Sequence, residues 1–335
     1  NNFYNKYLMS ELNSYFWLKN IFDEINFNNL PHGIIVNGPK GIGKRVLARA
    51  IASQLLLNKN TNNPDTDLLK SKNHPDFFIL DKEKILLKHI TFRKTKKKED
   101  WDEDLGERNV NEFLSTTPSI AINKVALILN AQTMDKAPQN ALLKSLEEPS
   151  PNTYIIITSD RSKALYQTIY SRCQTITIPP ISNSILDDWL LSQGITDYKS
   201  TDFPSYATPF NIINDIKNNE HNEFKDFINI LNNFLINKID QNLLIKNLNN
   251  SNLDLITKLN YLTEFLKIIL KSQLISESLS GIYKIFNNAK FNNLKISNIL
   301  NDINNLRDDY YKVPQINETH IMNYIFSELK NSIKI

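Results

Sequence analysis

A glycine-rich segment near the start of the chain constrains the fold more than any other feature. Gly38-Pro39-Lys40-Gly41-Ile42-Gly43-Lys44 follows the apolar run 33–37 and precedes apolar residues at helical spacing over 46–57. A buried strand that turns through glycines into a helix is typical of a wound α/β sheet. Such a turn presents backbone N–H groups and a lysine to phosphate oxygens. The predicted phosphate-binding residues are Gly38, Gly41, Gly43 and Lys44, and a turn that only joins strand to helix is the alternative.

Two further positions argue against catalysis at this loop. An active ATPase of this type places a Ser or Thr hydroxyl on Mg²⁺ directly after the lysine, but this chain has Arg45, which cannot ligate a cation. Such an ATPase also needs an acidic pair at the end of a neighbouring strand, where this chain has Leu129-Asn130. We therefore predict no intrinsic ATPase activity and no required cofactor or metal. Weak nucleotide or phosphate binding by Gly38–Arg45 stays open.

The rest of the first half repeats the alternation of strand and helix. Apolar runs at 124–129 and 154–158 predict two more buried strands. Between them we expect a helix that begins after Asp135 and ends before Pro149, with apolar residues along one face. Strands that alternate with helices predict a parallel sheet.

The chain changes character after Pro179-Pro180. Strand-like runs end there, and apolar residues at helical spacing continue through 224–235, 253–270 and 321–333. A chain of 335 residues is too long for one core. We expect an α/β domain followed by two all-α domains, with boundaries at residues 1–178, 179–222 and 223–335.

Four motifs resemble one known family. They are Leu30-Pro31-His32-Gly33, His74-Pro75-Asp76, the run Asn-Ala-Leu-Leu-Lys-Ser-Leu-Glu-Glu-Pro at 140–149, and Ser171-Arg172-Cys173. They stand in the order found in the delta prime family of DNA polymerase III clamp-loader subunits, which are AAA+ proteins. The resemblance extends over nearly the whole chain, although the second half matches only in pattern. It implies a RecA-like AAA+ domain with a parallel sheet, a small helical lid and a C-terminal helical collar bundle.

The resemblance also implies a function. In such a ring the arginine of Ser171-Arg172-Cys173 reaches the γ-phosphate held by the neighbouring subunit, so Arg172 would be an arginine finger acting in trans. The chain would be a non-hydrolysing stator in DNA replication, and a DNA-directed DNA polymerase (nucleotidyltransferase) component only by association. Implied partners are the motor (gamma/tau) and clamp-opening (delta) subunits, with the sliding clamp and primer-template DNA reached through the complex. An Arg172 that pairs with a carboxylate on its own surface is the alternative.

Two departures from the family narrow this expectation. Motor subunits carry a nucleotide-sensing arginine within a Gly-Ser-x-Arg stretch, and the matching residues 207–210 read Ala-Thr-Pro-Phe here. Many members carry a four-cysteine zinc module, whereas 57–74 contains no cysteine, and His74 alone cannot rebuild a site of four ligands. We expect a subunit other than the motor, without zinc, in which His74 is a loop or packing residue.

Charge leaves two other functions to weigh. The basic run Arg93-Lys94-Thr95-Lys96-Lys97-Lys98 could contact DNA, but five acidic residues follow within 99–104 and the whole chain carries a net charge of only +3. A solvated loop is favoured over a DNA contact. The alternatives to a stator are a catalytically active P-loop ATPase and a nucleic-acid-binding adaptor. One cysteine, no apolar leader and no apolar run of membrane length predict a cytoplasmic protein with no membrane partner.

Overall fold

The chain folds into two compact units. The computed structural model describes residues 12–61, 65–70, 73–91, 102–106, 108–310 and 317–334. One unit comprises residues 1–181 with 208–210, and the other comprises 182–207 with 211–335. The boundary lies beside Pro179-Pro180, where the sequence predicts a change of domain. The finer division near residue 222 stays a prediction, and the basic run Arg93–Lys98 lies outside the described residues.

A parallel sheet of five strands forms the centre of the first unit, in the order β2-β3-β4-β1-β5. The strands are β1 (Gly33–Asn37), β2 (Phe77–Leu80), β3 (Lys124–Ile128), β4 (Thr153–Ser159) and β5 (Gln174–Thr177). β1 lies between β4 and β5, with Ile34 in register with Ile156 and with Gln174. The predictions of β1, β3 and β4 are confirmed, whereas the sequence did not predict β2 or β5.

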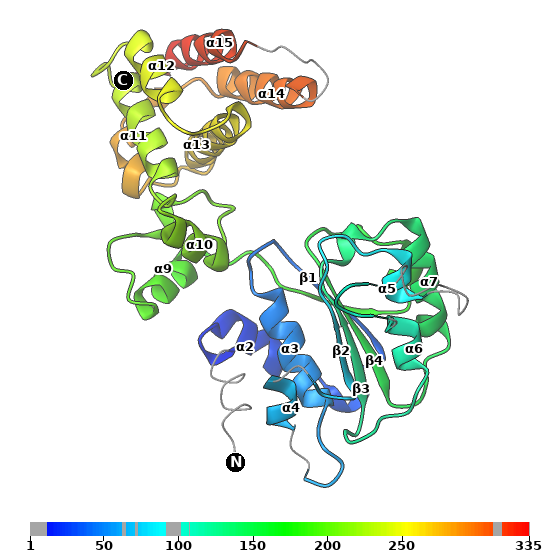
Figure 1. Cartoon of the computed structure of the whole chain (residues 1–335). Helices are drawn as coiled ribbons and strands as arrows, with labels where there is room; N and C mark the ends of the chain where they lie inside the picture. The colour runs from blue at the N-terminus through cyan, green and yellow to red at the C-terminus, as the bar shows by residue number, and fades with distance from the viewer. Residues whose placement is uncertain are drawn as a thin grey trace. The chain divides into compact units, whose positions relative to one another are not determined.

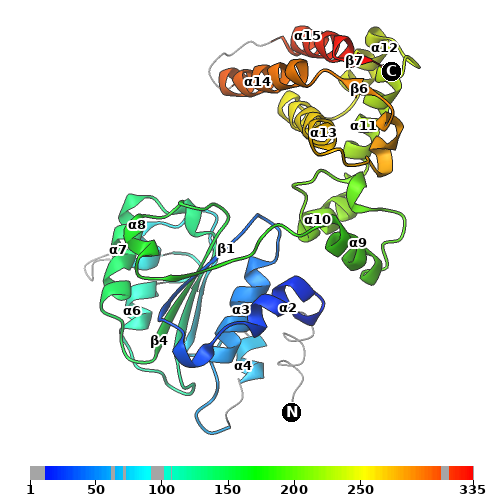
Figure 2. The same cartoon turned by 180° about the vertical axis from the view of Figure 1, so that it is seen from behind.

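Helices cover both faces of this sheet (Figure 1). One face carries α2 (Phe16–Asp23), α3 (Lys44–Leu55) and α4 (Thr66–Lys70), and the other carries α5 (Leu87–Ile90), α6 (Val110–Leu114) and α7 (Lys136–Glu147). The short α8 (Gln167–Tyr170) lies beside α7 (Figure 2). On the α7 face, Ile35, Ile128 and Ile157 of the sheet pack against Leu142 and Leu146 of that helix. This is the RecA-like arrangement that the sequence predicts.

Helices dominate the second unit. They are α9 (Asn183–Ser192), α10 (Pro209–Asn218, whose first residues belong to the first unit), α11 (Glu223–Leu235), α12 (Gln241–Asn249), α13 (Leu255–Ile275), α14 (Asn293–Tyr310) and α15 (Glu318–Asn331). The core of the bundle from α11 onward contains Phe227, Phe265 and Phe326, which are buried. Within the described ranges, no helix combines the length and the apolar character needed to cross a bilayer.

One expectation about the second unit is wrong. The sequence predicts no strand beyond Pro180, but β6 (Lys290–Phe291) and β7 (Ile333–Lys334) form a short antiparallel pair. Each strand has two residues, which is too short to leave an alternating pattern. Because β7 takes up Ile333, helix α15 ends at Asn331 rather than continuing to 333.

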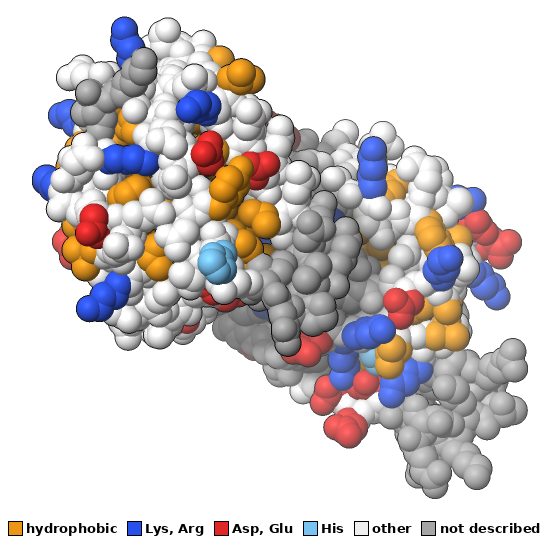
Figure 3. Space-filling view, turned by 90° about the horizontal axis from the view of Figure 1, so that it is seen from above, with side chains coloured by type: hydrophobic (Ala, Val, Ile, Leu, Met, Phe, Trp, Pro, Cys, Tyr) orange, Lys and Arg blue, Asp and Glu red, His pale blue; other side chains and the backbone are white. Residues whose placement is uncertain are grey.

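Charged side chains are mixed on the face of the molecule drawn in Figure 3. Lysine and arginine side chains there are interspersed with acidic and uncharged ones. The adaptor alternative depends on the basic run Arg93–Lys98, which is not among the described residues, so it stays a prediction.

Candidate functional site

The glycine-rich loop leaves the carboxyl end of β1 and enters α3, as the sequence predicts. Its shape depends on its glycines. Gly43 has a φ of 106°, in the left-handed region, and a Cβ there would lie 2.6 Å from Leu18 Cδ1. A Cβ on Gly38 would lie 2.8 Å from the carbonyl oxygen of Ile178. Larger residues at these two positions would displace the neighbouring chain.

The ammonium group of Lys44 is bound by its own chain. Its side chain is buried, and Nζ donates to the carbonyls of Gly38 at 2.8 Å and Pro39 at 2.7 Å. Nζ also lies 2.5 Å from Asp160 Oδ1, the first residue after β4. Burial lowers the pKa of Lys44, and the charge of Asp160 opposes that shift. Sequence reasoning missed Asp160, although its place at the carboxyl end of a strand beside β1 is where α/β ligand sites gather.

The position that would hold a magnesium-binding hydroxyl carries a paired arginine. The Arg45 guanidinium makes two hydrogen bonds to the carboxylate of Asp81, at 2.9 and 2.7 Å. Asp81 directly follows β2, and both side chains are exposed. This pairing fixes a positive charge where an ATPase would hold a cation.

The end of β3 offers no carboxylate. Leu129 is fully buried, and Asn130 has a left-handed φ of 57° with its N–H donating to Thr158 Oγ1 at 3.1 Å. Neither side chain can bind a metal as an anion or accept a proton from water. The two replacements predicted to remove catalysis therefore lie at the carboxyl edge of the sheet, next to the loop.

The carbonyl groups of the loop accept hydrogen bonds from distant parts of the first unit. Their donors are the Thr208 hydroxyl to Lys40 O (2.8 Å), the Phe210 amide to Gly41 O (3.1 Å) and the Trp17 indole to Ile42 O (3.1 Å). The ring of Phe210 also stacks on Tyr15, with centroids 4.9 Å apart. These hydrogen bonds tie the segments at Trp17 and at 208–210 to the loop. Phe210 stands where the family resemblance implies that motor subunits carry an arginine.

Arg172 lies at the opposite edge of the sheet from the loop. It precedes β5, which runs parallel to β1, so it lies level with the amino end of β1 while the loop leaves the carboxyl end. Five residues of strand span about 16 Å at roughly 3.3 Å each, which is longer than an arginine side chain. Arg172 therefore cannot reach a phosphate bound at the loop of its own chain.

The guanidinium of Arg172 is held at the surface by local acceptors. Its Nη2 lies 2.7 Å from Glu147 Oε1, in the last turn of α7, and its Nη1 donates to the Thr168 carbonyl at 2.8 Å. Both charged side chains are partly exposed, at 34% and 47%. Exposed pairs of this kind contribute about 0 to 1 kcal/mol. The surface pairing weighed from the sequence is therefore present, and it is weak enough to be exchanged for another anion.

Three of the four sequence motifs meet around Arg172. A Cβ on Gly33 would lie 2.8 Å from Cys173 Sγ and 3.0 Å from Arg172 O. His32 donates from Nε2 to the carbonyl of Leu146 at 2.7 Å. Burial raises the pKa of the Cys173 thiol to about 12, so it is a packing group rather than a nucleophile. These three motifs therefore pack against one another and position Arg172.

Comparison with known proteins decides the family. A family model described as DNA polymerase III, delta subunit, matches residues 16–182. Over these residues the chain belongs to the DNA polymerase III delta subunit family. Relatives named DNA polymerase III subunit delta′ include those of Haemophilus influenzae (29% identical, 50% of this chain and 48% of the relative) and Pseudomonas aeruginosa (34%, 48% and 46%). The chain spans about half the length of these two curated relatives. The resemblance inferred from the motifs is confirmed.

The similarity to solved structures is weaker. A crystal structure of a DNA polymerase III gamma subunit-related protein from Thermotoga maritima covers 95% of this chain and 99% of its own, with a TM-score of 0.41 and 14% identity.

The fourth motif of this delta subunit family member has a structural role. The buried carboxylate of Asp76 accepts hydrogen bonds from three consecutive backbone amides, of Ser119 (2.6 Å), Ile120 (2.8 Å) and Ala121 (2.8 Å). His74 Nδ1 accepts from the Asp76 amide at 3.1 Å. The motif therefore fixes the turn that leads into β3. In the part of the chain that the structure describes, no cluster of three or more His, Cys, Asp or Glu could hold a metal.

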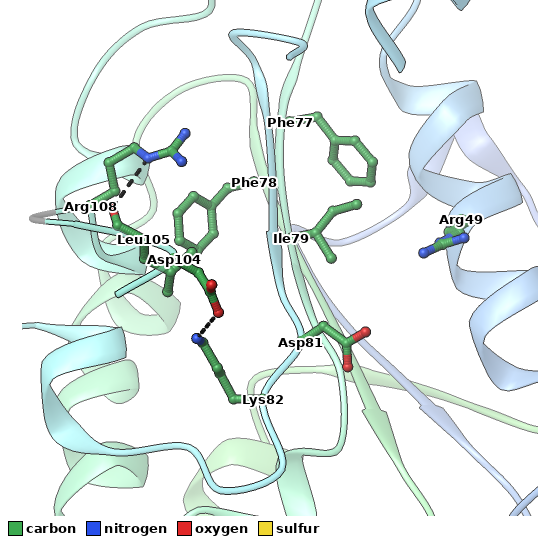
Figure 4. A pocket seen from close by; sticks show the side chains of 9 residues that line it. All are labelled: Arg49, Phe77, Phe78, Ile79, Asp81, Lys82, Asp104, Leu105 and Arg108. Carbon is green, nitrogen blue, oxygen red and sulfur yellow. Dashed lines mark hydrogen bonds and ion pairs between the residues drawn. The ribbon is translucent and has the colours of Figure 1, made fainter. Parts of the chain in front are cut away.

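A pocket of about 210 Å³ opens beside the edge strand β2 (Figure 4). Phe77 and Ile79 point toward Arg49 on α3, and Phe78 points to the other side of the strand. Lys82 at the rim lies 2.8 Å from Asp102 and 2.5 Å from Asp104. The lining holds three basic side chains (Arg49, Lys82 and Arg108) and two acidic ones (Asp81 and Asp104), of which Lys82 and Asp104 pair with each other.

Proposed function

We propose that this chain is a stator subunit of a DNA polymerase III clamp loader. It hydrolyses no ATP itself and donates Arg172 to the ATP site of an adjacent motor subunit. The observation that carries the proposal is the position of Arg172, partly exposed at the edge of the sheet away from its own loop. An arginine that cannot serve its own chain can still stabilise phosphoryl charge across a subunit interface.

The absence of ATPase activity in this proposal rests on three side chains. Lys44 is paired with Asp160, Arg45 is paired with Asp81, and Asn130 replaces a carboxylate. The loop remains because its carbonyls bind the segments at Trp17 and Thr208. A stator would combine these two features: a phosphate loop that stabilises the fold, and an arginine that acts at the ATP site of the adjacent subunit.

The partners in this proposal are the gamma/tau motor subunits and the clamp-opening delta subunit. The sliding clamp and primer-template DNA are reached through the assembled complex in the cytoplasm. The shared name of the relatives, a subunit of DNA polymerase III, supports this membership.

The test is the ATPase and clamp-loading activity of the reconstituted complex with Arg172→Ala. An arginine finger contributes roughly 10³ to 10⁵ in rate at the site it serves. We expect assembly to be unchanged and turnover at the adjacent site to fall by at least tenfold. The matched control is Arg108→Ala, which removes another exposed arginine bonded to a backbone carbonyl of its own unit. Unchanged turnover with Arg172→Ala would overturn the proposal.

A further inference from the structure

The carboxylate of Asp160 forms an ion pair with Lys44 of the phosphate loop. An ammonium group has three N–H donors. The three acceptors of Lys44 Nζ are the carbonyls of Gly38 and Pro39 and the carboxylate of Asp160. The hydrogen-bonding capacity of Lys44 is therefore complete without any ligand.

A second side chain fixes Asp160 in this position. Gln132 Nε2 donates to Asp160 Oδ2 at 3.1 Å, and the Asp160 amide donates back to Gln132 Oε1 at 3.3 Å. One carboxylate oxygen thus faces Lys44 and the other faces Gln132. The reciprocal bonds hold the end of β4 to the turn after β3, and the Asp160 side chain cannot turn away from the loop without losing its bonds to Lys44 and to Gln132 Nε2.

We propose that Asp160 is an internal substitute for phosphate, which closes the loop to polyphosphate ligands. A phosphate at this helix N-terminus would need the Lys44 charge. It would also come close to the Asp160 carboxylate, and like charges repel strongly at a buried site. The inference deepens the non-hydrolysing part of the proposed function and does not depend on Arg172.

The same residues determine which ligand would enter if Asp160 lost its charge. Lys44 would keep its two carbonyl acceptors but lack a counterion in a buried position. Arg45 is the next residue, and its guanidinium is paired with the carboxylate of Asp81. The two adjacent cations favour a polyphosphate, whereas the Arg45–Asp81 pair stands where an ATPase would place a hydroxyl to hold Mg²⁺. The latent ligand is therefore a polyphosphate free of magnesium.

The test is direct binding of pyrophosphate, and of ATP in EDTA, to the isolated full chain by calorimetry. We expect no binding by the wild type and binding by Asp160→Asn at least tenfold tighter than the wild-type limit. Binding should weaken when Mg²⁺ is added and disappear in Asp160→Asn with Lys44→Met. Asp135→Asn, which neutralises an exposed carboxylate of the same unit, should behave as the wild type.

Two further measurements keep the proposal falsifiable if Asp160→Asn folds poorly. Pyrophosphate should raise the Tm of Asp160→Asn but not of the wild type, because a ligand stabilises only the state that binds it. Gln132→Ala, which frees Asp160 without removing its charge, should give intermediate affinity. A folded Asp160→Asn that binds no better than the wild type would overturn the proposal, as would wild-type binding of equal affinity. Because no motor subunit is present, either result leaves the Arg172 experiment untouched.

Discussion

Replacement of Asp76 by alanine should destabilise the first unit far more than its single charge suggests. The side chain is 0% exposed, and its carboxylate accepts three backbone amides. A buried donor left without a partner costs about 1 to 3 kcal/mol. The Ala121 amide bears this cost in full, whereas those of Ser119 and Ile120 are partly open to water. Together the three unpaired amides lower the free energy of unfolding by about 3 kcal/mol. This is a large share of the roughly 5 to 15 kcal/mol that stabilises a typical domain.

The chain supplies its own probe for this measurement. Cys173 is the single cysteine and packs in the first unit, so its reaction with a thiol reagent in urea reports the unfolding of that unit. Asp76→Asn should lose nearly as much as Asp76→Ala, because its amide nitrogen faces at least one of the three donors. Asp135→Asn is the matched control, since its exposed pair with Lys84 contributes less than about 1 kcal/mol. A loss below about 1 kcal/mol for Asp76→Ala would refute the reasoning.

Three further outcomes follow from the geometry. Gly33→Ala should destabilise the first unit by about 1 to 3 kcal/mol in urea unfolding, because its Cβ would meet Cys173 Sγ at 2.8 Å; a neutral effect would contradict the packing. The native Cys173 thiol should resist alkylation at pH 8 and react on unfolding, since burial raises its pKa to about 12; rapid native labelling would disprove this. Burial lowers the pKa of His89, which pairs with Asp102, so the folded state binds a proton less readily than the unfolded one. Stability should then fall as the pH drops below 6.5, more in the wild type than in His89→Gln, and equal slopes would count against the assignment.

The predictable part of the fold consists of elements with long apolar runs. β1, β3 and β4 are buried over most of their length, so their composition alone marks them as strands. β5 is exposed at three of its four positions and β2 is only partly buried, so neither leaves such a run. They are strands because β1 and β3 offer them unpaired edges, which is a property of the assembled sheet.

The candidate site also contains residues that the sequence identifies and residues that only the structure reveals. Gly43, Lys44 and Arg45 are contiguous in sequence, and the motif identifies them. Asp160 acts on Lys44 only because β4 lies beside β1, and that adjacency is set by the sheet order. The ion pair of Glu147 with Arg172 depends on the packing of α7 against α8, which local pattern does not encode.

The hydrogen bonds to the carbonyls of the glycine loop bear on how such sequences are classified. The turn has two sides: backbone N–H groups that would bind phosphate, and carbonyl oxygens that accept from Trp17 and Thr208. Each side constrains the sequence separately. The glycines serve the second side whether or not the first binds a phosphate. A search that scores this turn by its glycines alone would not distinguish the proposed stator from an ATPase. A search that also scores the residue after the lysine and the end of β3 would distinguish them, because an ATPase of this type needs a hydroxyl and an acidic pair at those positions.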